Sequence, residues 1–297
     1  MRFGISAYDL SADELVDLAV AAEDAGFDSL WLGEHLFMPA GYHTVHPTRE
    51  PEEERSARIV GPDTQLLDPL VALAGAATRT SRIKLATGVY LLPLRHPLAV
   101  ARATLTLNEL SGGRLMLGVG TGWLREEFEA LGVPFAGRGA RQEECIEILR
   151  TAWAGGIFEH RGEHFSFGPV QVSAVPSPVP LVLGGNTPIA LQRAARVADG
   201  WFASGNPSAP DVLRYVEDLR TTEAAEGRAT PLTVYVRVSP PSLADLERFE
   251  AIGVEEMIFW AHELCPRAGA GAPRWAGLPA VAAALGVGGP GRLVASI

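Results

Sequence analysis

The chain has 297 residues, a length that suits one large α/β domain or two small ones. It is 47% hydrophobic and 20% charged, and no apolar run approaches the ~20 residues of a membrane span, so we expect a cytoplasmic protein without a membrane partner. The formal net charge of -10, without a basic patch, argues against a nucleic-acid partner.

The first two elements have clear local signals. The chain enters an apolar strand at 2–7 directly, so we expect no signal peptide. A helix is predicted at 12–25, because Ser11 and Glu14 form a capping box and Gly26 is a typical left-handed C-cap residue. One face of this helix has the apolar spacing of a helix packed on a sheet, with Leu15, Leu18, Ala19 and Ala22.

Strands and helices then alternate to the end of the chain. The strands are apolar almost throughout, as parallel strands buried on both faces are. We predict strands at 2–7, 29–33, 83–89, 115–119, 180–184, 200–204, 232–238 and 256–260. We predict helices at 12–25, 69–80, 97–109, 125–131, 138–154, 188–198, 211–225, 243–251 and 278–285. This order predicts a (β/α)8 TIM-like barrel, with a doubly wound open sheet as the competitor.

Two connections are longer than plain barrel loops. Residues 37–67 follow the second strand, so they lie on the carboxyl-terminal face as a candidate lid. Their charged run at 52–58 predicts a solvated loop or helix turn. Residues 155–179 separate the fourth and fifth strands, and 164–172 alternates like a short hairpin. We therefore expect one barrel domain over 1–297 with insertions after strands 2 and 4.

Two glycine-rich turns each follow an apolar strand and open a helix. The first contains Gly118, Gly120 and Gly122, and the second runs over 184–187. Such turns leave backbone N–H groups bare, which can hold an anion or the polar edge of a planar cofactor. Because strand ends converge on one barrel mouth, the two turns predict a single cofactor site.

The same mouth gathers other groups that lie far apart in the sequence. They follow the second, third, fourth, fifth, sixth and eighth strands and comprise Glu34, His35, Thr87, Gly88, Val89, Tyr90, Gly120, Thr121, Gly122, Trp123, Gly184, Gly185, Asn186, Thr187, Ser204, Gly205, Asn206, Trp260 and His262. The imidazole of His35 can move a proton near neutral pH, although a histidine at a strand end can equally be structural.

Several other residues have structural interpretations. Trp31 and Trp201 lie inside strands and are expected in the core, while Cys145 is expected to be a buried thiol. Asp199 precedes a strand, at the end of the barrel opposite the mouth, so we expect a cap or an ion-pair partner. Two further histidines could join His35, but no additional ligand stands at a fixed spacing, and we expect no metal site.

Short motifs in a fixed order resemble the luciferase-like monooxygenase superfamily and, within it, the oxidoreductases that use the deazaflavin coenzyme F420. No single motif is specific to this superfamily, but the occurrence of all of them in this order is. The resemblance extends from residue 3 to about residue 260. The motifs are FDSLWLGEH at 27–35, IKLATGV at 83–89, RHP at 95–97, LNELSGGR at 107–114, LGVGTGW at 117–123, LGG at 183–185 and ADGW at 198–201.

The resemblance implies roles for the residues that match these motifs. It implies a non-proline cis peptide at Gly88–Val89, which forms a bulge behind the isoalloxazine ring. It implies that His35 sits by the reactive carbon and that Glu34 stands where the family usually has Asp, so both are our catalytic and cofactor-binding candidates. The remaining cofactor-binding candidates are Thr87, Gly88, Val89 and Gly120, then Thr121 and Gly122 for the ring edge, and Gly184, Gly185, Asn186 and Thr187 for the phosphate.

One position departs from the family pattern. Members that oxidise sugar phosphates carry a glutamate proton donor just after the fourth-strand glycines, and this chain has Trp123 there. The departure argues against a sugar-phosphate substrate. It leaves the acid or base open among Glu126, Glu127 and Tyr90.

The leading hypothesis is an oxidoreductase that transfers a hydride between coenzyme F420 and a small organic substrate. The first alternative is an FMN-dependent monooxygenase of the same superfamily, which uses oxygen. The second is a barrel that has lost catalysis and only binds a flavin or another ligand. Family members are commonly homodimers, so the resemblance also implies a homodimer.

Overall fold

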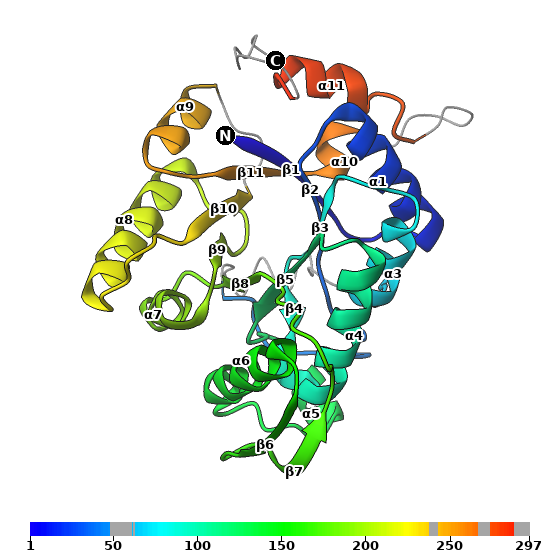
Figure 1. Ribbon diagram of the computed structural model, residues 1–297. Helices are drawn as coiled ribbons and strands as arrows, with labels where there is room; N and C mark the ends of the chain where they lie inside the picture. Colours follow the sequence, from blue (N-terminus) through cyan, green and yellow to red (C-terminus); the bar gives the residue numbers. More distant parts are fainter. Residues whose placement is uncertain (48–60, 62, 238–242, 267–273, 288–297) are drawn as a thin grey trace.

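The computed structural model describes residues 1–47, 61, 63–237, 243–266 and 274–287. Eight parallel strands form a closed ring with helices around it (Figure 1), in the order β1-β2-β3-β5-β8-β9-β10-β11. The pairing of β3 with β5, with Leu85 opposite Leu115, closes the ring. The predicted (β/α)8 barrel is therefore confirmed, and the open doubly wound sheet is excluded.

The predicted strands and helices are present, and their ends differ from the prediction by three residues at most. The ring strands are β1 (Arg2–Ala7), β2 (Ser29–Leu32), β3 (Lys84–Thr87), β5 (Leu115–Gly120), β8 (Leu181–Gly184), β9 (Gly200–Ala203), β10 (Thr233–Arg237) and β11 (Glu256–Trp260). The helices are α1 (Ala12–Ala25), α3 (Pro69–Ala77), α4 (Pro97–Leu110), α5 (Arg125–Ala130), α6 (Arg138–Ala154), α7 (Pro188–Val197), α8 (Ala209–Ala225), α9 (Leu243–Ala251), α10 (Ala261–Leu264) and α11 (Leu278–Ala284). The short elements β4 (Tyr90–Leu91) and η1 (Leu92–Leu94) follow β3 and were not predicted.

The hairpin beyond α6 differs from its prediction. It pairs β6 (Ile157–Arg161) with β7 (Ser166–Gln171), so the segment 164–172 holds only the second strand and not a whole hairpin. The position of the turn depends on Glu144 of α6. This carboxylate accepts hydrogen bonds from the backbone N–H groups of His164 at 2.9 Å and Phe165 at 2.8 Å. The contact with helix α6 therefore sets the position of the turn. The alternation of apolar and polar residues in the strands does not reveal this position.

The local signals of α1 are confirmed. The side chain of Ser11 accepts a hydrogen bond from the Glu14 N–H, and the Glu14 carboxylate accepts one from Ser11. Gly26 has the left-handed conformation with φ of 88°. The predicted stripe is fully buried, at Leu15, Leu18, Ala19 and Ala22.

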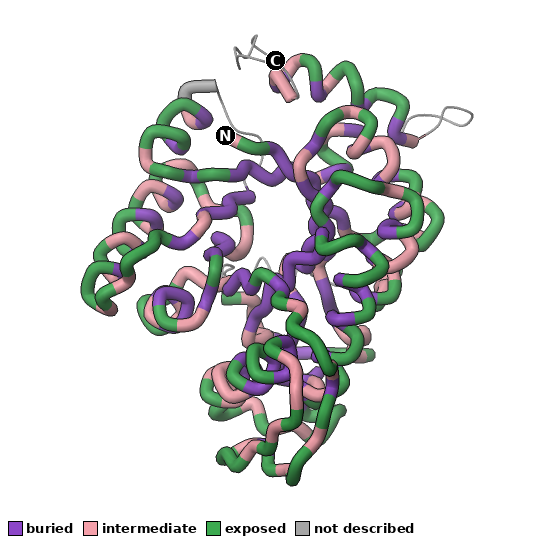
Figure 2. Tube along the Cα trace, viewed as in Figure 1, coloured by how far each residue is buried: buried purple, intermediate pink, exposed green. Residues whose placement is uncertain are grey.

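A packed layer fills the middle of the barrel below its mouth. Trp31 stacks on Phe202 with ring centroids 5.3 Å apart, and Tyr235 lies at 5.0 Å from Trp31. Figure 2 shows that the ring strands are mostly buried, whereas the helices are exposed on their outer sides. The full layer consists of Trp31, Ala86, Met116, Val182, Phe202, Tyr235 and Ile258. Because this layer closes the barrel, any ligand of the carboxyl-terminal face lies above it.

The structural interpretations of Trp31, Trp201, Cys145 and Asp199 also hold. Trp31 and Trp201 are fully buried, and burial raises the pKa of the Cys145 thiol to about 12. Asp199 accepts a hydrogen bond from the Leu181 N–H at 2.8 Å, at the amino-terminal end of β8. Within the described part of the chain, no group of metal-ligating side chains gathers, and no helix has the length and apolar character to cross a bilayer.

Glu23, near the end of α1, generates a stability prediction. Burial alone would raise the pKa of its carboxyl group, but hydrogen bonds from the N–H groups of Ile83, Arg82 and Ser81 lower it from 4.5 to about 2. The folded-state pKa thus lies below the unfolded value, so this stabilisation is present above about pH 4.5 and is lost as the pH falls toward 2.

We expect Glu23→Gln to lower the free energy of unfolding at pH 7 by about 1 kcal/mol, a value discounted for the partial exposure of the side chain. The loss should shrink as the pH falls from 4.5 toward 2, because the carboxyl group of the unfolded chain is protonated first and this protonation stabilises the unfolded state of the unaltered protein. Urea denaturation at several pH values measures this, with the exposed neighbour Asp24→Asn as the control. A loss that does not change with pH would contradict the assignment.

Candidate active site

The chain makes a cis peptide bond between Gly88 and Val89, just beyond β3. The resemblance implied this bond, and it is confirmed. Here β3 lies so close to β5 that a Cβ atom at Gly118 would collide with the carbonyl oxygen of Thr87. The Thr87 hydroxyl also donates a hydrogen bond to the Gly118 carbonyl at 2.7 Å. Thr87 and Gly118 therefore join the two strands directly below the barrel mouth.

The side chain of Val89 lies where the two glycine-rich turns meet. A Cβ atom at Gly120 would come within 2.5 Å of Val89 Cγ2, and one at Gly184 would come within 3.0 Å of Val89 Cγ1. Both glycines leave room for this side chain between β5 and β8. Val89 is half-buried and packs on the central layer of the barrel. It thus forms an apolar floor for part of the mouth.

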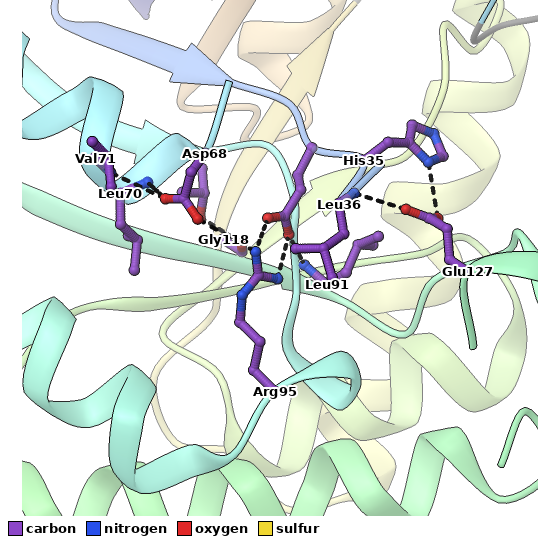
Figure 3. Close-up of polar contacts among 11 residues, drawn as sticks. His35, Leu36, Asp68, Leu70, Val71, Leu91, Arg95, Gly118 and Glu127 are labelled. Atoms are coloured by element: carbon purple, nitrogen blue, oxygen red, sulfur yellow. Dashed lines mark hydrogen bonds and ion pairs between the residues drawn. The ribbon is translucent and has the colours of Figure 1, made fainter. Parts of the chain in front are cut away.

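His35, which follows β2, forms a buried pair with Glu127 of α5. The His35 Nδ1 atom lies 3.0 Å from Glu127 Oε2, while Glu127 Oε1 accepts a hydrogen bond from the Leu36 N–H at 2.7 Å (Figure 3). The His35 ring also meets Trp123 edge to face, with centroids 5.6 Å apart. Nε2 of His35 has no hydrogen-bond partner among the described residues. One ring nitrogen is therefore oriented by a carboxylate and the other remains available to a ligand.

Glu34, the neighbouring candidate, is engaged in an ion pair. Its carboxylate lies 2.5 Å and 3.1 Å from the two terminal nitrogens of Arg95 and accepts a hydrogen bond from the Leu91 N–H at 2.6 Å. A terminal nitrogen of Arg95 also lies 3.6 Å from a carboxylate oxygen of Asp68 (Figure 3). Burial raises the pKa of Glu34, and Arg95 and Leu91 oppose the shift. Glu34 thus holds the segment that follows the cis peptide bond.

The three acid or base candidates occupy different surroundings. Glu126 accepts hydrogen bonds from the His43 N–H at 2.7 Å and the Thr44 hydroxyl at 2.7 Å. Burial alone would raise the pKa of Glu126, but these contacts lower it. Burial raises the pKa of Tyr90, and the Arg95 guanidinium covers its ring at 4.2 Å. Only Glu127, of the three, contacts His35.

Polar groups of three residues in the turn after β8 form hydrogen bonds with other parts of the protein. The Asn186 amide donates to the Ser204 carbonyl and accepts from the Ser204 N–H, both at 2.9 Å. Thr187 caps α7 by accepting a hydrogen bond from the Ala190 N–H at 3.4 Å. Gly185 has φ of 122°, and its carbonyl accepts a hydrogen bond from Trp201 at 2.7 Å. These four contacts fix the turn beside β9, next to the Val89 floor.

The ring-edge candidates lie at the end of β5. Thr121 and Gly122 are half-buried, and Gly122 has φ of 77°. A Cβ atom at Gly122 would come within 2.9 Å of the Phe128 ring, so glycine is needed here for the entry into α5. The Gly122 carbonyl accepts a hydrogen bond from Arg138 Nε at 3.0 Å.

Sequence reasoning missed Tyr8, which follows β1. Its hydroxyl oxygen is buried and has no hydrogen-bond partner within the described ranges. Its ring lies against Gly33, where a Cβ atom would come within 3.3 Å of Tyr8 Cδ2. Burial raises the pKa of Tyr8. The only signal in the sequence was its position directly after a strand.

The segment 37–47 of the candidate lid is held over this region. Thr44 is bound to Glu126, and the buried Tyr42 meets Trp123 edge to face with centroids 6.0 Å apart. His46 lies at 4.9 Å from the same indole, and it belongs to no metal cluster in the described residues. The charged run at 52–58 lies outside the described residues.

These features fit a planar redox cofactor. The half-buried Val89 supplies an apolar surface, while His35 Nε2 and the Tyr8 hydroxyl supply polar atoms without protein partners. A flavin or deazaflavin ring has both an apolar face and a polar edge. The mouth therefore offers both an apolar surface and polar atoms, which are the groups that a flavin or deazaflavin ring would contact.

The chain is similar to known proteins in sequence and in fold. The sequence model described as luciferase-like monooxygenase matches residues 2–260. An uncharacterized protein of Mycobacterium tuberculosis is 33% identical over 261 residues, which cover 87% of this chain and 88% of that protein. F420-dependent glucose-6-phosphate dehydrogenase of Nakamurella multipartita is 31% identical over 273 residues, 88% of this chain and 72% of that enzyme. Monooxygenase RslO1 from Streptomyces bottropensis shares the fold, with a TM-score of 0.70 at 20% identity over 95% of this chain and 97% of that one.

The contact between His35 and Glu127 predicts the tautomer of the histidine. A carboxylate only accepts hydrogen bonds, so we expect neutral His35 to carry its proton on Nδ1. Glu127→Gln introduces an amide that can also donate, and part of the molecules should then carry the proton on Nε2. Nitrogen NMR of the labelled ring distinguishes the two forms, with the exposed Glu129→Gln of α5 as the control. A proton on Nε2 in the unaltered protein would contradict the geometry.

Proposed function

The chain belongs to the luciferase-like monooxygenase family, and we propose that it is an oxidoreductase that transfers a hydride between coenzyme F420 and a small organic substrate. The observation that carries the proposal is the buried His35–Glu127 pair after β2, beside the Gly88–Val89 bulge of the adjacent strand β3. A relative of 31% identity that is named F420-dependent supports the choice of cofactor.

The cofactor-binding residues in this proposal come from four neighbouring strands. A bound deazaflavin would supply a ring carbon that gives or accepts a hydride. Val89 would support the ring from below, and the turn at the N-terminus of α7 would bind the phosphate. The complete proposed set is His35, Thr87, Gly88, Val89, Gly120, Thr121, Gly122, Gly184, Gly185, Asn186 and Thr187, with Glu34 as a residue that positions part of this set.

His35 is the proposed catalytic acid and base. Hydride removal from an alcohol carbon leaves the hydroxyl proton, and the unbonded Nε2 atom of His35 accepts it. In the opposite direction the imidazolium returns the proton to the carbonyl oxygen. Glu127 positions the ring and stabilises the imidazolium through Nδ1, at 3.0 Å.

Glu34 was expected to act in catalysis and cofactor binding, but we propose a positioning role for it instead. Its ion pair with Arg95 and its hydrogen bond from Leu91 hold the segment after the cis peptide, so we propose that Glu34 acts by positioning the bulge.

Trp123 limits the substrate. Its indole packs against His35 and Tyr42, so an apolar wall stands beside the proposed base. An apolar wall near the reacting atoms favours a small organic molecule over a phosphorylated sugar. This is consistent with the absence of a glutamate at this position in the sequence.

A fluorescence titration of the purified protein with F420 and, in parallel, with FMN tests the proposal. We expect micromolar or tighter binding of F420 and weaker binding of FMN. Gly184→Val should weaken F420 binding at least tenfold, about 1.4 kcal/mol, because its side chain would displace Val89. Gly168→Val is the matched control, since a Cβ atom at Gly168 meets nothing within 4 Å. A preference for FMN would instead support an oxygen-dependent monooxygenase.

Replacing His35 should separate chemistry from binding. We expect His35→Ala to slow hydride transfer at least 100-fold, the usual contribution of general acid–base catalysis, while the Kd for F420 changes less than threefold. Stopped-flow absorbance of the deazaflavin measures the transfer with a substrate found by screening alcohols. The exposed His43→Ala is the control. Unchanged transfer in His35→Ala would assign this histidine a structural role.

A further inference from the structure

Arg237 stands at the carboxyl-terminal end of β10, on the inner side of the barrel. Side chains alternate along a strand, so Arg237 faces the same side as Tyr235, which belongs to the central layer. Its guanidinium lies 3.9 Å from the centre of the Trp260 ring and 5.3 Å from that of Phe202. The positive charge therefore lies directly above the packed layer, within the mouth.

The surroundings of Arg237 provide no ion pair. The residue is 8% exposed, and among the described residues no carboxylate lies within ion-pair distance of its guanidinium. Its hydrogen bonds go to neutral oxygens: Ser6 Oγ at 3.1 Å, Asn206 Oδ1 at 3.3 Å and the Gly205 carbonyl at 3.4 Å. Burial lowers the pKa of Arg237 to about 9, and the exposed Glu263 only partly opposes this shift. A buried charge of this kind is unfavourable until an anion joins it.

Two other arginines, the half-buried Arg95 and the buried Arg114, show how this protein satisfies such a charge when the role is structural. Arg95 pairs with Glu34, as described above. Arg114 uses all five of its N–H groups, in hydrogen bonds of 2.6–3.0 Å to Ser111, Thr80, Ile83 and Ala77. Arg237 has only three such bonds, and all are longer. Two of its N–H groups, one on each terminal nitrogen, remain for a ligand.

A pair of N–H groups on the two terminal nitrogens matches the two oxygens of a carboxylate. The Trp260 and Phe202 rings stabilise the cation from its faces, but they accept no conventional hydrogen bond in its plane. In the ring of eight strands, β10 stands opposite β3, with three strands between them on either side. The charge thus lies across the mouth from the Gly88–Val89 bulge.

We propose that Arg237 binds the carboxylate of the substrate, so that the substrate is a small organic acid with an oxidisable alcohol or a reducible carbonyl. The choice of a substrate rests on the proposed function, whereas the oxyanion site itself does not. Asn206 is a positioning residue in this proposal, because its oxygen holds both Arg237 and the Trp260 indole, the latter at 3.0 Å.

The test uses the full-length protein without cofactor and measures its melting temperature with added sodium lactate. The neutral analogue 1,2-propanediol serves as the matched probe, since it differs from lactate only in carrying a hydroxymethyl group in place of the carboxylate. We expect lactate to stabilise the unaltered protein and the diol to have no effect. Arg237→Met should abolish the lactate effect, whereas the exposed Arg214→Met of α8 should retain it.

Two further measurements separate binding from structure. Arg237→Met should melt at the same temperature as the unaltered protein or higher, because removing an unpaired buried charge relieves a cost. Arg237→Lys keeps the charge without the planar fork and should weaken lactate binding at least tenfold. A strongly destabilised Arg237→Met, or equal lactate effects in all variants, would overturn the proposal.

The cofactor is the other possible source of an oxyanion, since F420 carries a phosphate. Arg237→Met should leave the Kd for F420 within threefold of its original value. A tenfold loss of F420 affinity would assign the guanidinium to the cofactor and overturn the substrate proposal. Should F420 fail to bind the unaltered protein while lactate still requires Arg237, the proposed cofactor would be wrong and the oxyanion site would stand.

Discussion

The close contact between β3 and β5 is the constraint on which the candidate site depends. Only glycine is tolerated at position 118, because the Thr87 carbonyl occupies the space of a Cβ atom. The chain then turns through the cis peptide and places Val89 between Gly120 and Gly184. Glycine is therefore required at three positions on β5 and β8 for one shared reason. The segment 87–89 passes so close to these strands that a Cβ atom would collide with it.

Two buried carboxylates hold the surroundings of this segment in place. Glu34 binds Arg95 and the backbone of β4, while Glu127 binds both the His35 ring and the backbone of Leu36. Each carboxylate satisfies a backbone N–H as well as a side chain, so neither strand end can shift without leaving a buried polar group unpaired. This explains how a mouth built from loops can keep a defined geometry.

Three arginines of the interior and the mouth differ in how completely their N–H groups are bonded by the protein. Arg95 and Arg114 are matched by a carboxylate or by a full set of oxygens, and both lie in structural positions. Arg237 is matched only in part and lies at the mouth. The contrast separates charges that support the fold from one whose donors remain available to a ligand. The sequence analysis did not single out Arg237, although an arginine two residues beyond Tyr235 on a largely apolar strand was an available signal.

The sequence by itself determined the order of the elements and the capping of α1, because apolar periodicity and capping residues act over a few neighbouring positions. It favoured the barrel over an open sheet, and the pairing of β3 with β5 in the structure decided between the two. The sequence also indicated His35 and the Gly88–Val89 bond, through motifs in a fixed order. Only the tertiary structure decided that Glu127, and neither Glu126 nor Tyr90, contacts His35, and that Glu34 pairs with Arg95. It alone located the turn between β6 and β7 and the surroundings of Arg237. The physical reason is that these contacts join residues far apart in the chain, whose distances depend on the closure of the whole ring.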